Sequence, residues 1–225
     1  MHIAILMANT DESDFAQRHP KDGEKFARLL GPLRPDWRFT TVVVKDGAFP
    51  ADLSDYDGFI ITGSPASVHD DQPWVHRLMQ VIREIRANGQ PLFGACFGHQ
   101  AIAKALGGRV ERNPGGWVFG LAETQMEGAP IRLYAAHVEQ VTQLPEGAEP
   151  LGGNTDCPVG AYRIGSHVLT TQYHPEIQPD FAAALVEEYR DKLPAEVAER
   201  AAASLAQEAE TGRMARRIVA FFEGG

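Results

Sequence analysis

The sequence contains few cysteines and no long apolar run. Only two cysteines, Cys96 and Cys157, occur in 225 residues, and they are far apart in unlike settings. This excludes a disulfide framework and a four-cysteine zinc site. No run of about 18 apolar residues could span a bilayer, and the short apolar start is followed directly by acidic residues, unlike a cleavable signal peptide. We therefore expect a cytoplasmic protein without a membrane partner.

Positive charge is also scarce. Lysine and arginine total 21 against 30 aspartates and glutamates, which gives a formal net charge of −9. A protein that holds nucleic acid through its phosphates needs the opposite balance, so no nucleic-acid partner is expected. Phosphate-cradling glycine motifs and recognisable metal-ligand spacings are absent too, and we expect neither a cofactor nor a metal. The hydrophobic share of 44% is ordinary for a chain that builds a core.

Strand-like and helix-like segments alternate through the first half of the chain. Short apolar runs rich in β-branched residues are followed by stretches with apolar residues at helical spacing. The expected strands cover 2–7, 39–44, 58–62 and 91–95, and the expected helices cover 23–33, 74–88 and 100–106. This alternation predicts an α/β fold: a mostly parallel, doubly wound sheet with helices on both faces and any site at the carboxyl ends of the strands.

The second half changes pattern twice. From 109 to 171 it has short strand-like segments, which we expect to complete the sheet and to add an antiparallel ribbon. These segments are 118–126, 131–136, 158–164 and 168–173. After Pro179 the pattern is helical, over 181–192 and then over an alanine-rich stretch from 195 to 222 that is interrupted at Gly212, with Pro194 at a first helical position. We expect a domain over 1–192 and a C-terminal helical extension over 193–225 packed on it.

Cys96 lies where an apolar strand runs into a helix. The sequence there is PLFGACFGHQ, with glycines two residues before and after the cysteine. A nucleophile on such a turn is held in a strained backbone, and the glycines allow close approach of neighbouring chain. The start of the helix also favours a thiolate. The alternative is an inert buried cysteine beside glycines that serve packing.

Among the eight histidines, His174 is the best placed to act as a base for Cys96. It ends the strand expected over 168–173, so it emerges at the same sheet edge as Cys96. Pro175 makes the chain extended there, and Glu176 follows on the same side, able to accept a hydrogen bond from the imidazole. The three residues would act as nucleophile, base and orienting carboxylate. The alternative is that the His-Pro-Glu segment is a surface turn.

The segments GACFGHQ and QYHPE, at this spacing, resemble the class I (triad) glutamine amidotransferases, which have a flavodoxin-like sheet. NPGGW and TGSPASVHDDQPW resemble the stand-alone, GMP-synthase-like branch, and the resemblance covers about residues 1–190. It implies that Cys96 attacks the γ-carboxamide of glutamine, His174 protonates the leaving ammonia, and Glu176 orients His174. Water would then hydrolyse the γ-glutamyl thioester.

The resemblance also implies the residues around this triad. Backbone N–H groups of Gly63 and Phe97 would hold the oxyanion. The residues that correspond to the family's substrate contacts are Gln100, Ala136, His137 and Val138. An alternative for Gln100 is a helix glutamine without a role, and Cys157 corresponds to a small buried hydrophobe on a strand.

The sequence departs from the family in one wall of this pocket. The stretch AAHVE stands where the family usually has Ser/Asn-His-Gly-Asp, so Ala136, Val138 and Glu139 replace a small polar residue, glycine and aspartate. A valine does not easily adopt a backbone conformation reserved for glycine, so this wall of the pocket is expected to differ. The acyl-transfer chemistry is unaffected, but the γ-glutamyl substrate is left open.

Three functions therefore stay open. The leading prediction is a stand-alone amidotransferase-type hydrolase that acts on glutamine or another γ-glutamyl amide. The chain lacks the ATP-using half of a GMP synthase, so ammonia would pass to a separate synthetase or be released. The second is a γ-glutamyl peptidase on the same triad, and the third is a non-catalytic binding or regulatory protein that keeps the fold.

Overall fold

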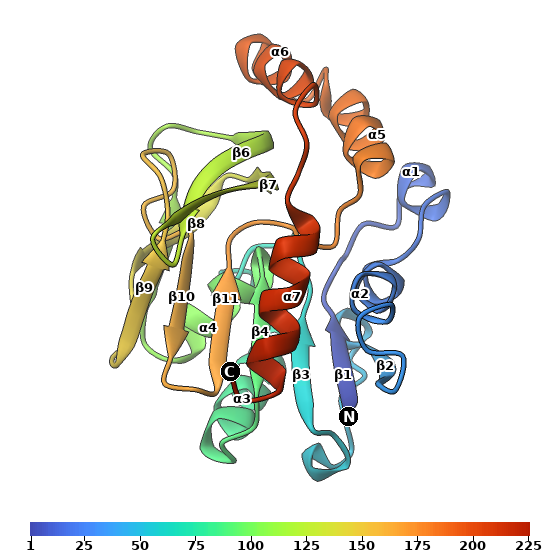
Figure 1. The fold of residues 1–225 in the computed structure, drawn as a ribbon, viewed down its shortest axis with the longest axis vertical. Helices are drawn as coiled ribbons and strands as arrows, with labels where there is room; N and C mark the ends of the chain where they lie inside the picture. The colour runs from blue at the N-terminus through green and yellow to red at the C-terminus, as the bar shows by residue number, and fades with distance from the viewer.

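The computed structural model describes all residues from 1 to 225 and shows a seven-stranded central sheet in the order β2-β1-β3-β4-β11-β10-β9 (Figure 1). The strands β2, β1, β3, β4 and β11 pair in parallel, whereas β10 and β9 are antiparallel to their neighbours. The strands are β1 (His2–Met7), β2 (Arg38–Val43), β3 (Gly58–Ile61), β4 (Leu92–Ala95), β9 (Ala148–Gly152), β10 (Ala161–Ile164) and β11 (Val168–Thr171). The predicted mostly parallel sheet is confirmed.

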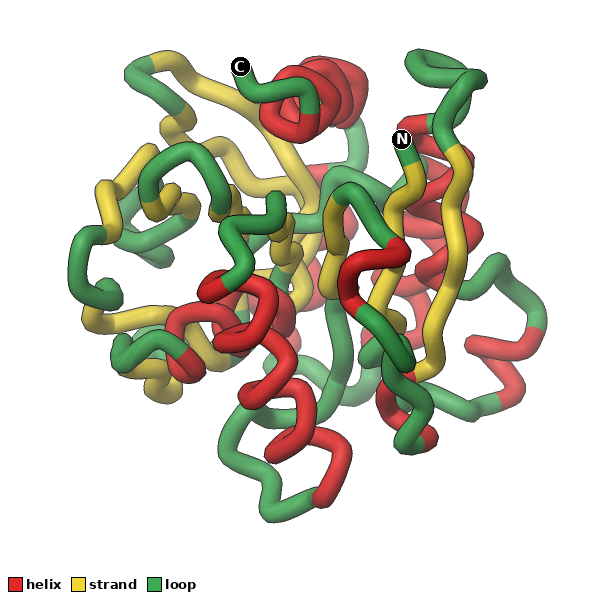
Figure 2. Tube along the Cα trace, turned by 90° about the horizontal axis from the view of Figure 1, so that it is seen from below, coloured by secondary structure: helices red, strands yellow, loops and turns green.

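Helices cover both faces of this sheet, as predicted (Figure 2). The helices α3 and α4 pack on one face, and α2 and α7 pack on the other. The helices are α1 (Asp14–Gln17), α2 (Asp22–Leu30), α3 (Pro73–Ala87), α4 (Phe97–Ala105), α5 (Pro179–Tyr189), α6 (Ala195–Ser204) and α7 (Thr211–Phe222). The short helix α1 has no counterpart among the sequence predictions.

The central strand β1 shows why apolar runs form this sheet. Its side chains alternate between the faces: Ala4 and Leu6 pack with α3 and α4, whereas Ile3 and Ile5 pack with α2 and α7. All four are completely buried. A strand buried on both faces reads as a continuous apolar run instead of an alternating one, which is the pattern that the sequence shows.

The C-terminal helical stretch differs from the prediction in where it is interrupted. The break covers 205–210, and Gly212 lies inside the first turn of α7. Pro194 is the N-cap of α6, one position before the helix begins. Along α7 the apolar residues Met214, Ile218 and Phe222 are buried in the same cluster as β1, β3 and β4. The division of the chain at residue 192 stays a prediction.

Two short antiparallel ribbons flank the sheet. They are β5 (Arg109–Arg112) with β8 (Glu139–Gln143), and β6 (Val118–Met126) with β7 (Ala129–His137). The sequence predicted one ribbon, because β5 and β8 are short and mostly polar. Pro150 lies in β9 at the edge of the sheet, where a missing N–H is tolerated.

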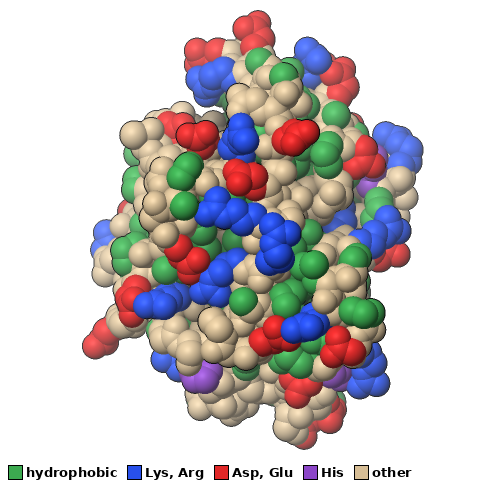
Figure 3. Space-filling view, viewed as in Figure 1, with side chains coloured by type: hydrophobic (Ala, Val, Ile, Leu, Met, Phe, Trp, Pro, Cys, Tyr) green, Lys and Arg blue, Asp and Glu red, His purple; other side chains and the backbone are tan.

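The carboxyl ends of the parallel strands face the part of the molecule that carries α1, α5, α6 and the β6–β7 ribbon (Figure 1). The face covered by α7 carries arginine side chains interspersed with acids (Figure 3). Arg217 pairs with Glu127, and Arg213 pairs with Glu210. None of the helices combines the length and the apolar character that a bilayer span requires.

Candidate active site

Cys96 occupies the turn between β4 and α4 in a strained backbone conformation. Its φ is 49° and its ψ is −105°. Apart from glycine, only Cys96 and Glu127 have a positive φ, which is uncommon for residues with a Cβ. The flanking glycines allow the turn: a Cβ on Gly98 would lie 2.4 Å from the carbonyl oxygen of Ile61, and one on Gly94 would lie 2.7 Å from the backbone of Gly98.

The thiol of Cys96 is buried, and one side-chain hydrogen bond to its sulfur is present. The residue is 4% exposed. Its backbone N–H donates to the carbonyl of Thr171 at 2.9 Å, which ties the turn to the neighbouring strand. The side-chain amide of Gln172 donates to the Cys96 sulfur at 3.7 Å.

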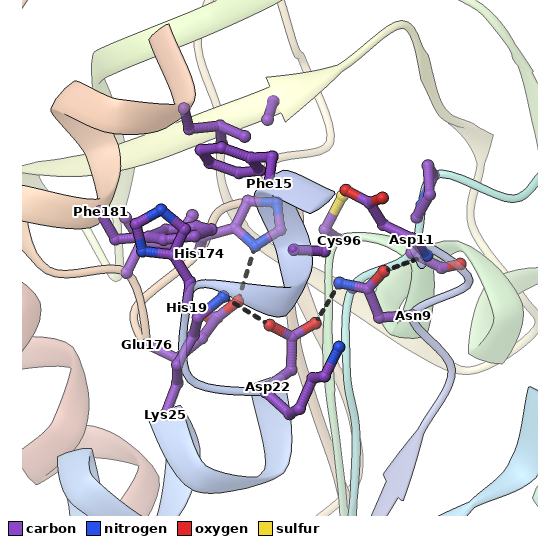
Figure 4. A pocket seen from close by; sticks show the side chains of 18 of the residues that line it. Asn9, Asp11, Phe15, His19, Asp22, Lys25, Cys96, His174, Glu176 and Phe181 are labelled. Carbon is purple, nitrogen blue, oxygen red and sulfur yellow. Dashed lines mark hydrogen bonds and ion pairs between the residues drawn. The ribbon is translucent and has the colours of Figure 1, made fainter. Parts of the chain in front are cut away.

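His174 leaves the sheet beside Cys96, as predicted. The strands β4 and β11 are parallel, and Ala95 lies opposite Thr171, so both chains leave the sheet at one edge. The backbone N–H of His174 donates to the carbonyl of Tyr134 at 2.8 Å, and its Nδ1 donates to Oε1 of Glu176 at 2.7 Å (Figure 4). Its Nε2 is buried and has no hydrogen-bond partner, so that atom is free for proton transfer.

The electrostatics of His174 favour the protonated ring. Burial alone lowers the pKa of an imidazole, but the charge and hydrogen-bond interactions with Cys96 and Glu176 outweigh it and raise the pKa of His174 well above its ordinary value. Glu176 is only 2% exposed, so its charge is weakly screened. A ring in this setting can hold a proton next to the thiol.

Gly63 lies directly against His174 and Cys96, with no room for a larger residue. A Cβ at this position would lie 2.7 Å from Cε1 of His174 and 3.7 Å from Cβ of Cys96. The backbone N–H of Gly63 makes no hydrogen bond in the chain, and neither does that of Phe97 at the first position of α4. The two N–H groups predicted to hold an oxyanion are therefore both unpaired.

The predicted substrate contacts are only partly brought to the pocket that holds Cys96. Ala136 lines it, but Gln100, His137 and Val138 do not. The side-chain amide of Gln100 donates to the carbonyl of Glu139 at 2.8 Å and to Oε1 of Gln172 at 3.2 Å. Gln100 thus lies outside the pocket and contacts Gln172, which in turn contacts the Cys96 sulfur.

The stretch that departs from the family has an ordinary backbone. Val138 has no positive φ, so the glycine-only conformation considered from the sequence does not occur there. His137 is 3% exposed, its Nδ1 donates to the carbonyl of Glu139 at 3.0 Å, and its Nε2 is unpaired. Burial, which outweighs this hydrogen bond, lowers the pKa of His137 to about 4.

Sequence reasoning missed most of the pocket wall. After β1 ends at Met7, the chain runs along the pocket from Asn9 to Lys25 (Figure 4). Asp22 of this segment accepts hydrogen bonds from Asn9 at 2.7 Å and Lys25 at 2.8 Å. Because this loop follows the carboxyl end of a parallel strand, where sites of such folds lie, the sequence could have indicated that it lines the pocket.

Aromatic side chains form another part of the pocket wall, and no sequence motif predicted them there. They come from α1, from the start of β6 and the residue before it, and from α5, segments far apart in the sequence. They are Phe15, Trp117, Phe119, Phe181 and Tyr189. Trp117 and the Gly63–Pro65 loop belong to the NPGGW and TGSPASVHDDQPW segments, so both segments reach the pocket.

The second cysteine lies outside this pocket. Cys157 is completely buried, as predicted, but it lies in the loop between β9 and β10 and not on a strand. Burial raises its pKa to about 12. Its sulfur contacts the carbonyl of Val159 at 3.7 Å. No three side chains among His, Cys, Asp and Glu lie together in a way that could hold a metal ion.

Comparisons with known proteins agree with this geometry. A family model described as glutamine amidotransferase class-I matches residues 37–187. Gamma-glutamyl peptidase 4 of Arabidopsis thaliana is 31% identical over 200 residues, 81% of this chain and 79% of the relative. GMP synthase [glutamine-hydrolyzing] of Thermotoga maritima is 30% identical over 162 residues, 69% of this chain and 31% of the relative.

A solved structure shows the same fold. The crystal structure of a glutamine amidotransferase from Thermotoga maritima superimposes with a TM-score of 0.76 and 17% identity, covering 99% of this chain and 96% of that chain. The family match covers more than half of the 225 residues and includes the Cys96 turn and the segment of His174 and Glu176. The chain therefore belongs to the class I glutamine amidotransferase family.

Proposed function

We propose that Cys96, His174 and Glu176 form a triad that hydrolyses γ-glutamyl amides. The observation that carries this proposal is the hydrogen bond of 2.7 Å from His174 Nδ1 to Glu176, which leaves Nε2 free beside a cysteine on a strained turn. A nucleophile, a base and an oriented carboxylate are the parts that acyl transfer needs. The amidotransferase-type hydrolase is the function class that the family membership gives.

The first half of the reaction forms a thioester. The Cys96 thiolate attacks the γ-carbonyl carbon, and the electron pair moves to the carbonyl oxygen, where the free N–H groups of Gly63 and Phe97 hold the oxyanion. Each such donor is typically worth about 3 kcal/mol. His174 gives its Nε2 proton to the leaving nitrogen, the C–N bond breaks, and the amine or ammonia leaves.

The second half hydrolyses this thioester. His174 Nε2, now neutral, takes a proton from water, whose oxygen attacks the same carbon, and the C–S bond breaks to release glutamate and the thiolate. Gln100 acts through Gln172 in this scheme: it fixes the amide that contacts the sulfur, so we propose that it positions Cys96 without touching substrate.

Glutamine itself and γ-glutamyl peptides are the two substrate candidates. The aromatic wall favours the peptide candidate, because a leaving ammonia needs no apolar surface, whereas the side chain of a leaving amino acid does. The relatives include proteins named gamma-glutamyl peptidase as well as GMP synthase. The chain spans 31% of the GMP synthase, and in the glutamine case we propose that the ammonia passes to a separate synthetase or is released.

Parallel measurement of released ammonia and free glutamate tests the proposal. The isolated chain should cleave γ-glutamyl dipeptides with a higher kcat/KM than glutamine, and free glutamine should show a KM at or above about 1 mM, the upper end of the usual range. Glutamine turnover that rises only when a synthetase is added would favour the ammonia-supplying role. No glutamate from any γ-glutamyl compound would favour a non-catalytic binding protein.

A further inference from the structure

One lysine in the wall of the Cys96 pocket has no partner. Lys21 precedes α2 as its N-cap residue, and it lines the same pocket as Cys96 and His174. Its Nζ is buried, makes no hydrogen bond and has no carboxylate within ion-pair distance. An ammonium withdrawn from water without a partner is costly, so such groups are rare unless something else pairs with them.

Glu12, an acidic residue near Lys21, already has other partners. Glu12 pairs with Lys45 at 2.7 Å and accepts a hydrogen bond from Gln17 at 2.8 Å. The pKa of Glu12 is lowered mainly by its hydrogen bond and charge interaction with Lys45, and least by the charge of Lys21. The charge of Lys21 therefore lies close enough to Glu12 to help lower its pKa, but Lys21 does not pair with Glu12.

A second nearby carboxylate, Asp22, is equally engaged, and Glu24 accepts a hydrogen bond from the backbone N–H of Lys21 at 3.2 Å. Lys25 pairs with one oxygen of Asp22 at 2.8 Å, and Asn9 donates to the other at 2.7 Å (Figure 4). Lys25 also lies over the ring of Phe181, with Nζ 3.6 Å from the ring centroid. Of the three lysines in this pocket wall, Lys25 and Lys45 are paired, and Lys21 is left with an unused positive charge.

We propose that Lys21 is the carboxylate-binding residue of the substrate pocket. This rests on the proposed function, because every γ-glutamyl compound carries an α-carboxylate. Hydrogen bonds between an ammonium and a carboxylate are among the strong ones in proteins. A substrate carboxylate would therefore give Lys21 the partner that no residue of the chain provides. The carboxylate can come from the glutamyl part or from the C-terminus of a leaving amino acid, and the two sources are separable by experiment.

Binding by a Cys96→Ala variant tests the proposal without requiring turnover. The three probes are glutamine, γ-glutamylphenylalanine and γ-glutamylphenylalanine with an amidated C-terminus, each measured by calorimetry. Lys21→Met removes the charge at similar length, Lys21→Arg keeps it, and Lys192→Met removes the charge of an exposed lysine paired with Glu188. We expect Lys21→Met to weaken binding by about tenfold or more, and the other two changes to have little effect.

The pattern over the probes identifies the carboxylate. An equal loss for all three assigns Lys21 to the α-carboxylate, and a loss confined to the free-acid dipeptide assigns it to the leaving group. Equal affinity of Lys21→Met and its parent for every probe, or no binding of any probe by the parent, overturns the proposal. If these affinities depend on Lys21 but wild type hydrolyses nothing, the proposed reaction fails and the binding site stands.

Thermal unfolding separates this role from a structural one. Because an unpaired buried charge destabilises the folded state, Lys21→Met should raise the melting temperature of the ligand-free protein while it weakens binding. A lower melting temperature together with unchanged affinity would show that Lys21 merely supports the start of α2.

Discussion

The two cysteines of this protein are both buried, yet their surroundings differ in every respect that matters for reactivity. Cys96 is on a turn with a positive φ, beside an imidazole whose other nitrogen is bonded to Glu176. Cys157 faces a backbone carbonyl, and burial together with the charges of Cys96 and Asp156 raises its pKa to about 12. Neighbouring groups, and not burial, distinguish the proposed nucleophile from the second cysteine.

The histidines show the same contrast. His174 and His137 are both almost completely buried, but the pKa of His174 is raised by nearby negative charge, whereas that of His137 is lowered to about 4 by burial. Each has an unpaired Nε2. Of these two histidines, only His174 has a carboxylate partner, and so of the two only His174 can hold a proton at neutral pH.

The largest effect should come from replacing Cys96. Cys96→Ser or Cys96→Ala should lower the hydrolysis of γ-glutamyl substrates by about 1,000-fold or more, because no other group supplies the nucleophile. Circular dichroism and melting should show the fold retained. A folded Cys96→Ser variant with near wild-type turnover would mean that the nucleophile is another residue.

The base should matter more than the residue that orients it. His174→Ala removes the proton carrier, whereas Glu176→Gln only relaxes the direction and tautomer of the ring, so its loss in kcat should be smaller by about tenfold or more. Steady-state kinetics on one γ-glutamyl dipeptide decide this. The opposite order of kcat values would refute the division of roles.

Gly63→Ala should lower kcat, because the added methyl group displaces the His174 ring. The new Cβ would lie 2.7 Å from the His174 ring, which must move, and small displacements of catalytic groups can cost about 100-fold in rate. Gly212→Ala is the matched control, because its nearest neighbouring atom is 3.8 Å away. Comparable kcat values for the two variants would show that the ring position is not critical.

Buried neutral histidines should make the protein sensitive to acid. Burial lowers the pKa of His99 to about 3 and that of His137 to about 4. Because both folded-state values lie below those of the unfolded chain, the unfolding free energy should fall as pH drops below 6.5, by about 1 to 2 kcal/mol per histidine down to pH 5. The raised pKa of His174 acts in the opposite sense and above pH 6.5.

Urea unfolding at pH 7, 6 and 5 measures this dependence. The variant His137→Gln should have a flatter profile than wild type, because one of the two groups no longer titrates. Unfolding free energies that are equal at pH 7 and pH 5 in wild type would contradict the assignment of neutral rings.

The smallest effect is expected for Cys157→Ser. Turnover should be nearly unchanged because the thiol lies outside the pocket, and the loss of stability should be about 1 kcal/mol, the centre of the usual range for single substitutions. Kinetics and melting of this variant complete the comparison with Cys96→Ser. If Cys157→Ser lost both activity and fold, Cys157 would instead be essential to the core.

The sequence predicted the sheet and the proximity of Cys96, His174 and Glu176 because both depend on local signals. Apolar runs such as 2–7 form buried strands wherever they lie, and parallel strands bring Cys96 and His174 to one edge. The His174–Glu176 contact needed only an extended chain between residues two apart. These features require no knowledge of which distant segments meet.

The pocket wall depended on distant segments and was therefore not predicted. Lys21 and Tyr189 reach the same pocket from opposite ends of the chain, and no motif marks either of them. Gln100 was expected at the substrate from the family resemblance, but its side chain donates to the carbonyl of Glu139 and does not line the Cys96 pocket. The sequence predicted a helical extension packed on the domain, but it did not indicate that α7 packs against β1, β3 and β4.

Covalent labelling tests most directly the claim that Cys96 is a nucleophile activated by His174. A glutamine analogue with an electrophilic group in place of the γ-carboxamide is incubated with the intact chain, and peptide mass spectrometry locates the adduct. We predict an adduct on Cys96 and none on Cys157, with labelling strongly slowed in His174→Ala. An unmodified Cys96, or equal labelling of both cysteines, would contradict the account.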